Sequence, residues 1–384
     1  MHRFPLKLDK NLQLRKDANS FRKLGARERK IDLASNDYLG LTSSLSILEE
    51  VQRILKEKDL LKNGAGGSRL LTGNHLLYDL AETEVSDLFS SESALIFNSG
   101  YDANIGFFSS LPRRGDYIIY DELSHASIRD GIALSKAKAF KFKHNDLKDL
   151  EEKISRVKKD IFEGEIYVVT EAVFSMDGDM PDLNGLIEIS EKYGCLPILD
   201  EAHAAGVIGE NGKGSVTGLP LQEKIFARLV TFGKAFGAHG AAILGSNKLK
   251  DYLVNFSRSL IYTTAMPPHS VATIVAATRH LQGEGQQELE KLRSNIRFFT
   301  SEVIKNDLQE RFIPSFSAIH SCIIPGNSEV KRIASALQAE GFDVKPILSP
   351  TVSEGKERLR FCLHSSNSEE ELSAVVSLLA RLIK

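Results

Sequence analysis

The stretch IYVVTEAVFSMDGDMPDLNGLIEISEKYGCLPILDEAH, residues 166–203, decides the fold. Short apolar runs at residues 166–170 and 196–199 flank a segment, residues 182–193, whose leucines and isoleucines recur with near-helical spacing. Gly194 ends that segment as a helix stop. The stretch therefore predicts a strand, a covering helix and a second strand, which is the repeating unit of an α/β sheet.

The same alternation extends outward from about residue 45 to about residue 285. It predicts a large α/β domain, residues 45–284, after an N-terminal segment, residues 1–44. The further strands expected in that domain lie at residues 94–97, 117–120, 228–232 and 241–244. Charged helix, strand candidates at residues 317–324 and 359–363, and a final helix predict a smaller C-terminal domain, residues 285–384.

The composition narrows the class of protein. Lys and Arg number 49 against 51 Asp and Glu, so a formal charge of -2 gives no global attraction to nucleic acid or to an anionic membrane. No apolar run approaches the roughly 20 residues of a membrane-spanning helix, and the N-terminus lacks the apolar core of a secretory signal. The three cysteines are widely spaced and odd in number, which favours a reducing compartment. We therefore expect a cytoplasmic protein that binds neither nucleic acid nor membrane.

Polar residues follow four of the expected strands, at the edge where open α/β sheets bind ligands. They stand at residues 98–101, 170–171, 200–203 and 231–234. Singly, each could be solvated surface. Together they favour an anionic, aromatic cofactor, because Asp200 suits a cationic ring nitrogen and Lys234 suits an aldehyde. The donors expected for its phosphate are Ser99, Gly100 and Thr231.

Three competing motifs fail on spacing. The run Leu-Asp-Glu-Ala-His, residues 199–203, copies a nucleotide motif of helicases, but the sequence has no Gly-x-x-x-x-Gly-Lys-Ser/Thr loop. The glycine cluster at residues 64–68 follows a charged helix rather than a strand, which argues against a dinucleotide-binding dehydrogenase. His203 with Asp200 is the only metal-like pair, and two ligands do not make a metal site, so no metal is expected.

Six blocks of the sequence resemble the α-oxoamine synthases, a family of pyridoxal-phosphate enzymes, in the same order. They are SNDYLGL at 35–41, GGS at 66–68, LSHAS at 123–127, TEAVFSMDGD at 170–179, DEAH at 200–203 and TFGKAFG at 231–237. The resemblance runs from about residue 22 to residue 360. It implies an aspartate aminotransferase-like (fold type I) α/β domain with a mainly parallel seven-stranded sheet, a smaller α+β C-terminal domain, and a homodimer with a shared active site.

The resemblance also implies a reaction. These enzymes use pyridoxal 5'-phosphate to join an amino acid to an acyl thioester with loss of carbon dioxide. Residues 231–242 and 260–268 are most similar to the branch that serves biotin biosynthesis, which implies L-alanine and a pimeloyl thioester of coenzyme A or of a carrier protein. Another condensing synthase, such as a 2-amino-3-ketobutyrate ligase or a serine palmitoyltransferase, and a pyridoxal-phosphate aminotransferase remain alternatives.

Roles for single residues follow from the same resemblance. Lys234 would hold the cofactor as a Schiff base and then act as the base at the α-carbon, while Asp200 would pair with the pyridine nitrogen. His125 would stack on the ring, and His203 would bond its phenolic oxygen. The remaining cofactor contacts implied are Ser99, Gly100, Tyr101, Ser175, Thr231 and, from the neighbouring subunit, Thr264.

Substrate contacts are implied less sharply. Arg360 is expected to bind the carboxylate of the amino acid, with Arg358 as the alternative. Arg22 and Asn36 would lie beside the acyl tail. Tyr78 departs from the family pattern, since relatives often carry a histidine there, and whether His75 compensates stays open.

Overall fold

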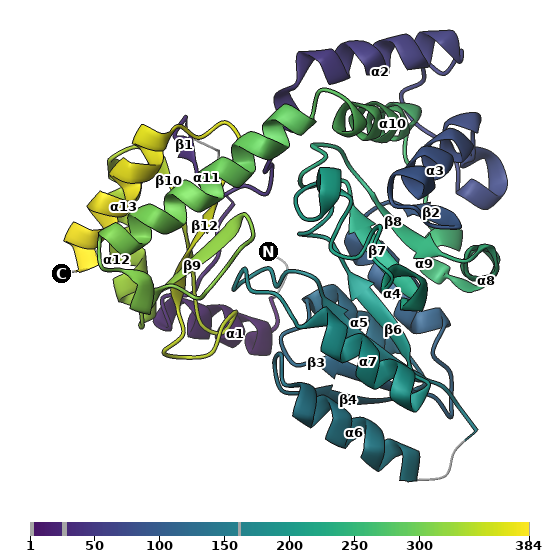
Figure 1. Ribbon diagram of the computed structural model, residues 1–384, viewed down its shortest axis with the longest axis horizontal. Helices are drawn as coiled ribbons and strands as arrows, with labels where there is room; N and C mark the ends of the chain where they lie inside the picture. The colour runs from purple at the N-terminus through teal and green to yellow at the C-terminus, as the bar shows by residue number, and fades with distance from the viewer. Residues whose placement is uncertain (1–3, 25–28, 160–162, 384) are drawn as a thin grey trace. The chain divides into compact units, whose positions relative to one another are not determined.

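The structure is a computed structural model that describes residues 4–24, 29–159 and 163–383 (Figure 1). Their contacts group them into two compact units. The larger unit contains the described residues of 36–175 and 180–290, and the smaller unit those of 1–35, 176–179 and 291–384. The domain limits expected at residues 44 and 284 stay predictions.

A seven-stranded sheet forms the centre of the larger unit, in the order β2-β8-β7-β6-β5-β3-β4. The five strands from β7 to β4 run parallel to one another, and β8 runs antiparallel to both its neighbours. The expectation of a mainly parallel seven-stranded sheet is therefore confirmed. The bounds are β2 Ser93–Phe97, β3 Tyr117–Asp121, β4 Lys138–Phe142, β5 Ile166–Glu171, β6 Leu196–Asp200, β7 Ala227–Thr231 and β8 Ala241–Gly245.

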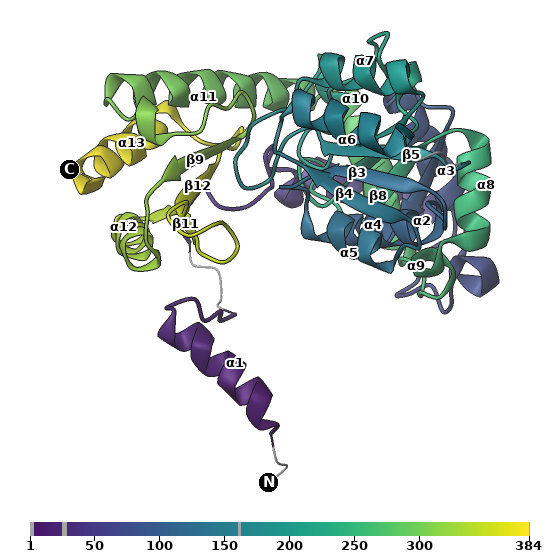
Figure 2. The same ribbon diagram turned by 90° about the horizontal axis from the view of Figure 1, so that it is seen from below.

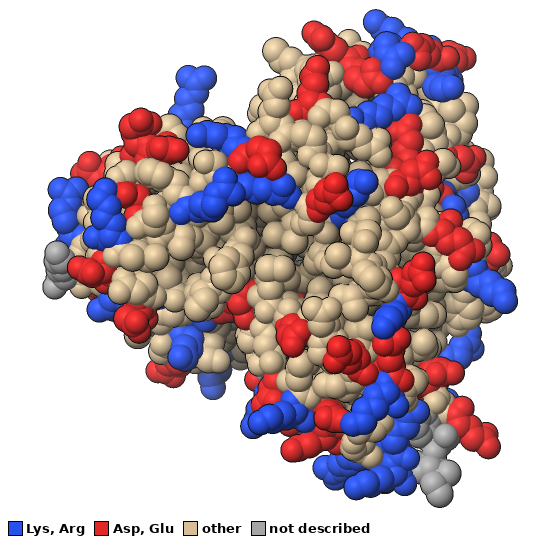
Figure 3. Space-filling view, in the orientation of Figure 1, with Lys and Arg blue, Asp and Glu red and all other residues tan. Residues whose placement is uncertain are grey.

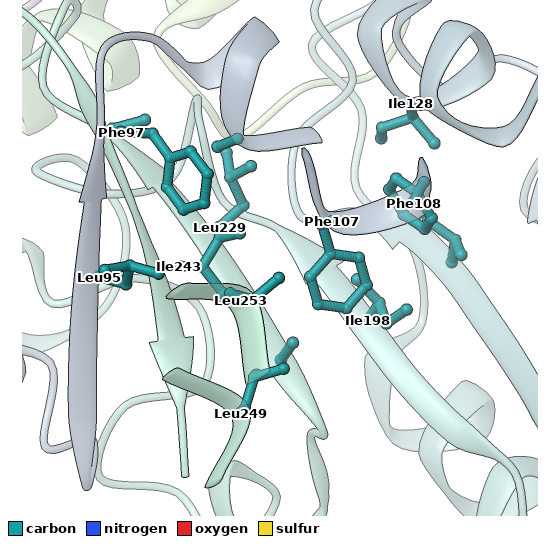
Figure 4. Packing of buried hydrophobic residues seen from close by; sticks show 14 of the residues in the cluster. Leu95, Phe97, Phe107, Phe108, Ile128, Ile198, Leu229, Ile243, Leu249 and Leu253 are labelled. Carbon is teal, nitrogen blue, oxygen red and sulfur yellow. The ribbon is translucent and has the colours of Figure 1, made fainter. Parts of the chain in front are cut away.

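Helices cover both faces of this sheet, which is why its inner strands are apolar throughout. One core joins α4, α5 and α8 to the sheet through residues such as Phe107, Ile128 and Leu253 (Figure 4). The other joins α6 and α7 through Ile154 and Ile187. The helices of this unit are α2 Leu45–Glu57, α3 Leu76–Leu88, α4 Gly100–Ser110, α5 Ala126–Leu134, α6 Leu147–Lys159, α7 Leu183–Tyr193, α8 Asn247–Phe256, α9 Arg258–Ile261 and α10 Pro268–Gln282.

The crossover helix expected at residues 182–193 is α7. The Asp182 side chain accepts a hydrogen bond from the Gly185 amide and caps the helix, and Gly194 ends it with a φ of 62°. Strand β4 was not expected from the sequence. It is the edge of the sheet, and its lysines hide the apolar run by which an inner strand is identified.

The smaller unit is an α+β structure. An antiparallel sheet in the order β11-β12-β9 is built from β9 Ile319–Ile323, β11 Lys345–Ile347 and β12 Arg358–Cys362. A short parallel pair joins β1 Ile31–Asp32 to β10 Phe342–Asp343. The α-helices are α1 Leu6–Asp17, α11 Gln286–Lys305, which belongs to this unit from Lys291 onward, α12 Asn327–Ala339 and α13 Glu369–Ile383. Helix α1, drawn in purple in Figure 2, has no buried residue.

Single turns complete the described chain. They are η1 Leu41–Ser43, the π-turn η2 Arg69–Gly73, η3 Glu210–Gly212, η4 Gln222–Lys224 and η5 Gln309–Arg311. Acidic and basic side chains interleave over the face shown in Figure 3. Among the helices in the described part of the chain, none is both long and apolar enough to cross a bilayer.

Candidate active site

Three polar residues end adjacent strands of the larger sheet. Glu171 is the last residue of β5, Asp200 of β6 and Thr231 of β7. The register places Glu171 beside Asp200 on neighbouring parallel strands. The carboxyl ends of parallel strands share one edge of a sheet, so these side chains mark the ligand-binding edge of the larger unit.

Asp200 is buried and held in one orientation. Its Oδ2 accepts a hydrogen bond of 3.0 Å from Asn104 Nδ2, and its Oδ1 accepts one of 2.9 Å from the Ala202 amide. Asn104 lies one turn into α4 and is itself 5% exposed. A carboxylate fixed in this way can offer its charge to a ligand without reorganising.

His125 caps the N-terminus of α5. Its Nδ1 lies 2.8 Å from Ser127 Oγ and 3.2 Å from the Ser127 amide nitrogen. Loss of solvation lowers the pKa of His125. The charge of Asp200 opposes that shift and the charge of Lys234 adds to it, so all three expected site residues act on one another.

Glu171 is a second buried carboxyl beside Asp200, with 4% of its surface exposed. Burial, and then the neighbouring charge of Asp200, raise the pKa of Glu171 well above its usual range. Its Oε1 accepts a hydrogen bond of 2.5 Å from the His125 amide. The sequence placed Glu171 at a strand end but gave it no role, and its contact with His125 spans 46 positions of the chain.

Lys234 follows β7 in a tight turn and is half-buried. The Gly237 amide donates to the Lys234 carbonyl at 2.9 Å, and the Phe232 amide donates to the Gly240 carbonyl at 2.9 Å. The positive charge of Lys234 acts to lower the pKa of both His125 and Glu171. An amine, a fixed carboxylate and an imidazole therefore share this edge of the sheet.

The N-terminus of α4 supplies the donors expected for a phosphate. Ser99 caps the helix and accepts from the Asp102 amide at 3.1 Å, whereas the amides of Gly100 and Tyr101 open the helix and have no carbonyl partner within it. A Cβ on Gly100 would lie 3.8 Å from Thr231 Oγ1, so the threonine hydroxyl faces this backbone. The side chain of Tyr101 is exposed, and its hydroxyl donates to Asp130 at 2.5 Å.

His203 and Asn36 are linked through a residue that sequence reasoning gave no role. Tyr38, which is 1% exposed, has its hydroxyl 2.6 Å from His203 Nδ1 and 3.2 Å from Asn36 Oδ1. Tyr38 lies in the stretch at residues 35–41 that resembles the α-oxoamine synthases, and that position was the one sequence feature that pointed to it. Ser175 is half-buried and follows β5.

The other expected site residues lie elsewhere. Thr264 is exposed after α9, and its carbonyl accepts from Asn98 Nδ2 at 2.8 Å. Arg22 and Arg360 belong to the smaller unit. Arg22 is exposed and donates to Thr351 Oγ1 at 3.2 Å. Arg360 is half-buried on β12.

The structure shows the surroundings of two residues that the sequence left open. The buried guanidinium of Arg358 pairs with Asp177 and donates to the Lys356 carbonyl at 2.9 Å. Tyr78 is 1% exposed, its ring lies 3.9 Å from the Arg69 guanidinium, and its hydroxyl accepts from the Met266 amide at 2.9 Å. Packing thus accounts for Tyr78. Within the described ranges, no cluster of three metal-ligating side chains occurs.

The sequence matches the family described as aminotransferase class I and II over residues 28–379. It is 39% identical to 8-amino-7-oxononanoate synthase of Emericella nidulans, over 91% of this chain and 88% of that protein. It is 36% identical to a putative 8-amino-7-oxononanoate synthase of Halalkalibacterium halodurans, over 98% of this chain and 95% of that protein.

Solved structures of similar fold come from the same group of enzymes. The crystal structure of 8-amino-7-oxononanoate synthase from Francisella tularensis superposes with a TM-score of 0.77 at 29% identity, over 92% of this chain and 98% of that one. Serine palmitoyltransferase from Sphingomonas wittichii gives a TM-score of 0.89 at 26% identity, over 99% and 98% of the two chains.

The donor set of the larger unit fits pyridoxal phosphate. Asp200 is a buried carboxylate for the ring nitrogen and Lys234 is an amine for the aldehyde. The open amides of α4 and the Thr231 hydroxyl suit a phosphate dianion. The chain therefore belongs to the aminotransferase class I and II family and, within it, to the α-oxoamine synthases, which depend on pyridoxal phosphate.

Proposed function

We propose that this protein condenses L-alanine with a pimeloyl thioester to give 8-amino-7-oxononanoate, carbon dioxide and a free thiol, a reaction of biotin biosynthesis. The observation that carries the proposal is the meeting of Lys234, Asp200 and His125 at one sheet edge. The names of the relatives support the choice of substrates.

The chemistry divides between the cofactor and the chain. When bound, pyridoxal phosphate supplies an aldehyde for the amine of the amino acid and a ring that accepts the electron pair left at the α-carbon. Asp200, held by two hydrogen bonds, would place a fixed negative charge beside the ring nitrogen and favour its protonated form. Gly100, Tyr101 and Thr231 would bind the phosphate.

Lys234 moves the protons. Its amine would hold the cofactor between turnovers and, when free, would take the α-proton of alanine. The α-carbon would then attack the thioester carbonyl, with loss of the thiol, and carbon dioxide would leave from the alanine carboxyl. Lys234 would return a proton to the same carbon. His125 would cover one face of the cofactor ring, and His203 with Ser175 would bond its phenolic oxygen.

The substrate carboxylates need cations. We assign the alanine carboxylate to Arg360, as the family resemblance implies; Arg358 is the more deeply buried of the two and pairs with Asp177. We assign the far carboxylate of the pimeloyl group to Arg22, with Asn36 beside the acyl chain. A recognised terminal carboxylate separates a dicarboxylic acyl group from a plain fatty one by roughly one to two decades in kcat/KM.

We further propose a cytoplasmic homodimer with shared active sites. Leu70, Leu71 and Tyr262 are 51%, 81% and 72% exposed, which is unusual for large apolar side chains. The Ala265 amide donates to the Gly67 carbonyl at 2.9 Å and ties the two segments that carry them together. We call these three side chains the η2 patch. Thr264 belongs to the same segment as Tyr262, which supports its assignment to the neighbouring subunit's phosphate.

The decisive experiment is product analysis. Purified protein is incubated with carboxyl-labelled L-alanine and pimeloyl thioester, on coenzyme A and on a carrier protein, and the products are identified by mass spectrometry. We expect 8-amino-7-oxononanoate, with labelled carbon dioxide and free thiol in equal amounts, and far less product from heptanoyl thioester. Glycine with acetyl-CoA and serine with palmitoyl-CoA are the matched comparisons.

Each alternative predicts a different result. Equal activity with pimeloyl and heptanoyl thioesters would reject the biotin-pathway assignment and favour another condensing synthase. Accumulation of pyridoxamine phosphate without carbon dioxide would identify an aminotransferase. The Lys234→Ala variant sets the background for both measurements.

A further inference from the structure

Two buried polar residues that sequence reasoning passed over connect Asp200 to His125. Asn104, on α4, is 5% exposed and Ser127, on α5, is 1% exposed. Asn104 Nδ2 lies 3.0 Å from Asp200 Oδ2 and 3.0 Å from Ser127 Oγ. Ser127 Oγ in turn lies 2.8 Å from His125 Nδ1. We call this chain the Asn104–Ser127 relay.

The direction of every hydrogen bond in the relay is fixed by chemistry. A carboxylate only accepts, so the Asn104 amide must present its NH₂ group to Asp200, and the flipped amide would set two acceptors against each other. The second hydrogen of the same NH₂ group goes to Ser127 Oγ. The Ser127 hydroxyl accepts there and keeps its own hydrogen, so it can donate to His125 Nδ1 when that atom carries a lone pair.

A second donor converges on the same nitrogen. The Ser127 amide lies 3.2 Å from His125 Nδ1 and is a donor in any state. Two donors facing Nδ1 require a lone pair on that atom. The imidazole is therefore neutral, and its single proton sits on Nε2.

We propose that Asn104 and Ser127 are positioning residues that hold His125 as the neutral Nε2–H tautomer and tie the orientation of its ring to Asp200. The value of the relay for the reaction rests on the proposed function, because it assumes that His125 and Asp200 both face the cofactor ring. The tautomer itself follows from the hydrogen bonds alone.

The charged residues around His125 show why the Asn104–Ser127 relay matters for its protonation. Asp200, on β6, and Asp130, on α5, favour a proton on the ring, while Lys234 and Arg129 disfavour one. Glu171, on β5, accepts a hydrogen bond from the His125 amide. A protonated imidazole would compete with the cofactor's ring nitrogen for the charge of Asp200. The relay keeps that charge for the cofactor, because Nδ1 cannot take a proton without losing the hydrogen bond from the Ser127 amide and reversing the one to the Ser127 hydroxyl.

The test is the protonation state of His125 in the full-length protein, with and without pyridoxal phosphate. Histidine labelled with ¹⁵N in both ring nitrogens is observed by two-dimensional NMR, and His125→Gln identifies its signals. We expect the Nδ1 resonance of an unprotonated nitrogen and the Nε2 resonance of a protonated one. In Ser127→Ala the backbone amide of residue 127 still faces Nδ1 but the hydroxyl is gone, so we expect a smaller excess of the Nε2–H tautomer and about a fivefold increase in the proton affinity of His125, the effect of one lost hydrogen bond.

Ser124→Ala is the matched control. Ser124 lies three residues earlier, is also 1% exposed, and its hydroxyl has no hydrogen-bond partner among the described residues. Its signals should match those of the wild type. Ser127→Thr keeps the hydroxyl, so His125 should stay in the Nε2–H tautomer. Asn104→Ala removes the link to Asp200 and should weaken the preference of His125 for that tautomer.

A proton on Nδ1 in the wild type, or an unchanged titration in a folded Ser127→Ala protein, would overturn the proposal. The product analysis tests the proposed function, and its outcome does not depend on these NMR signals. An Nε2–H tautomer in a protein that forms no 8-amino-7-oxononanoate would reject the proposed function and leave the relay supported.

Discussion

At the scale of single residues, the site depends on a few groups whose charge the fold controls. Asp200 is fixed by two hydrogen bonds, and burial and the charge of Asp200 raise the pKa of Glu171 beside it. The raised pKa disfavours a second negative charge next to Asp200. Substitutions here should change chemistry more than stability.

Lys234→Ala should abolish the covalent link to the cofactor. Without that amine the α-proton also lacks its base, and general bases contribute about a hundredfold to ten-thousandfold in rate. Borohydride reduction followed by peptide mass spectrometry should find cofactor on Lys234 in the wild type and on no lysine in the variant. Lys213→Ala, a half-buried lysine of a nearby loop, is the control. Cofactor reduced onto another lysine would refute the assignment.

Asp200→Asn should keep the fold and slow removal of the α-proton. A neutral amide no longer favours a protonated ring nitrogen, and a loss of several kcal/mol in the barrier corresponds to about a thousandfold in rate. Exchange of the alanine α-proton with deuterated water, followed by NMR without any thioester, measures this step alone. Asp130→Asn, an exposed neighbour, should exchange normally. Near-normal exchange in Asp200→Asn would remove Asp200 from this role.

His320 should make the smaller unit sensitive to acid. Burial lowers the pKa of His320 to about 4 from an ordinary 6.5. Between these values the unfolded chain binds a proton that the folded chain does not, so stability rises with pH and is lost as pH falls from 6.5 towards 4. The loss approaches about 3 kcal/mol.

Urea unfolding at several pH values measures the slope of the free energy of unfolding against pH. His320→Phe removes the titrating group but keeps an aromatic ring beside Phe299, whose centroid lies 5.0 Å from that of His320. The variant should lose most of the slope between pH 4 and 6.5. The exposed His269→Gln control should retain it. An unchanged slope in His320→Phe would mean that other groups cause the acid sensitivity.

At the scale of elements, a buried ion pair joins β7 to Glu201, the residue that follows β6. Arg228 is 4% exposed and donates through Nε to Glu201 Oε2 at 2.6 Å, through Nη1 to the Phe89 carbonyl at 3.0 Å and through Nη2 to Thr217 Oγ1 at 2.8 Å. Glu201, which is 0% exposed, also accepts from the Ser215 amide at 2.6 Å. The pair thus fixes residues 213–217 against the strands that carry Asp200 and Thr231.

Arg228→Met should destabilise the larger unit by about 3–5 kcal/mol, because Glu201 is left charged and buried. Urea unfolding gives the free energy, and hydrogen exchange should show lost protection in β6, β7 and residues 213–217. Arg53→Met removes an arginine that is 54% exposed and paired with Glu50 and Glu57, and should change stability by no more than about 0.5 kcal/mol. Equal effects of the two substitutions would contradict this account.

The elements also show what the sequence could predict. Inner strands such as β5 and β6 were found because both their faces are buried, which leaves an unbroken apolar run. Asp200 and Thr231 were found because they end such strands, and Lys234 because it follows one closely. Asn104, Ser127 and Tyr38 were not, because their roles depend on hydrogen bonds between distant positions, 96 apart for Asn104 and Asp200. No local pattern records such a contact.

At the scale of the whole molecule, the proposed homodimer can be tested through the η2 patch. Leu71→Glu places a charge on a side chain that is 81% exposed, so the fold of one chain should tolerate it while an apolar interface should not. We expect a monomer by sedimentation velocity, with weaker cofactor binding. Leu134→Glu, at a leucine that is 62% exposed on α5, should stay dimeric. A dimeric, fully active Leu71→Glu protein would place the interface elsewhere.

The edge strand β4 shows how the protein prevents pairing between the sheet edges of two copies. It pairs only with β3, so one row of its backbone N–H and C=O groups has no partner strand in the described sheet. Phe140 in the middle of the strand is 44% exposed, which would suit a foreign strand. Lys138 and Lys141 on either side of it, and the Lys and Arg side chains gathered over the adjoining α6 in Figure 3, repel a second copy of the same edge. The lysines that hid β4 in the sequence are therefore a safeguard against strand addition, and against the open-ended aggregates to which it leads.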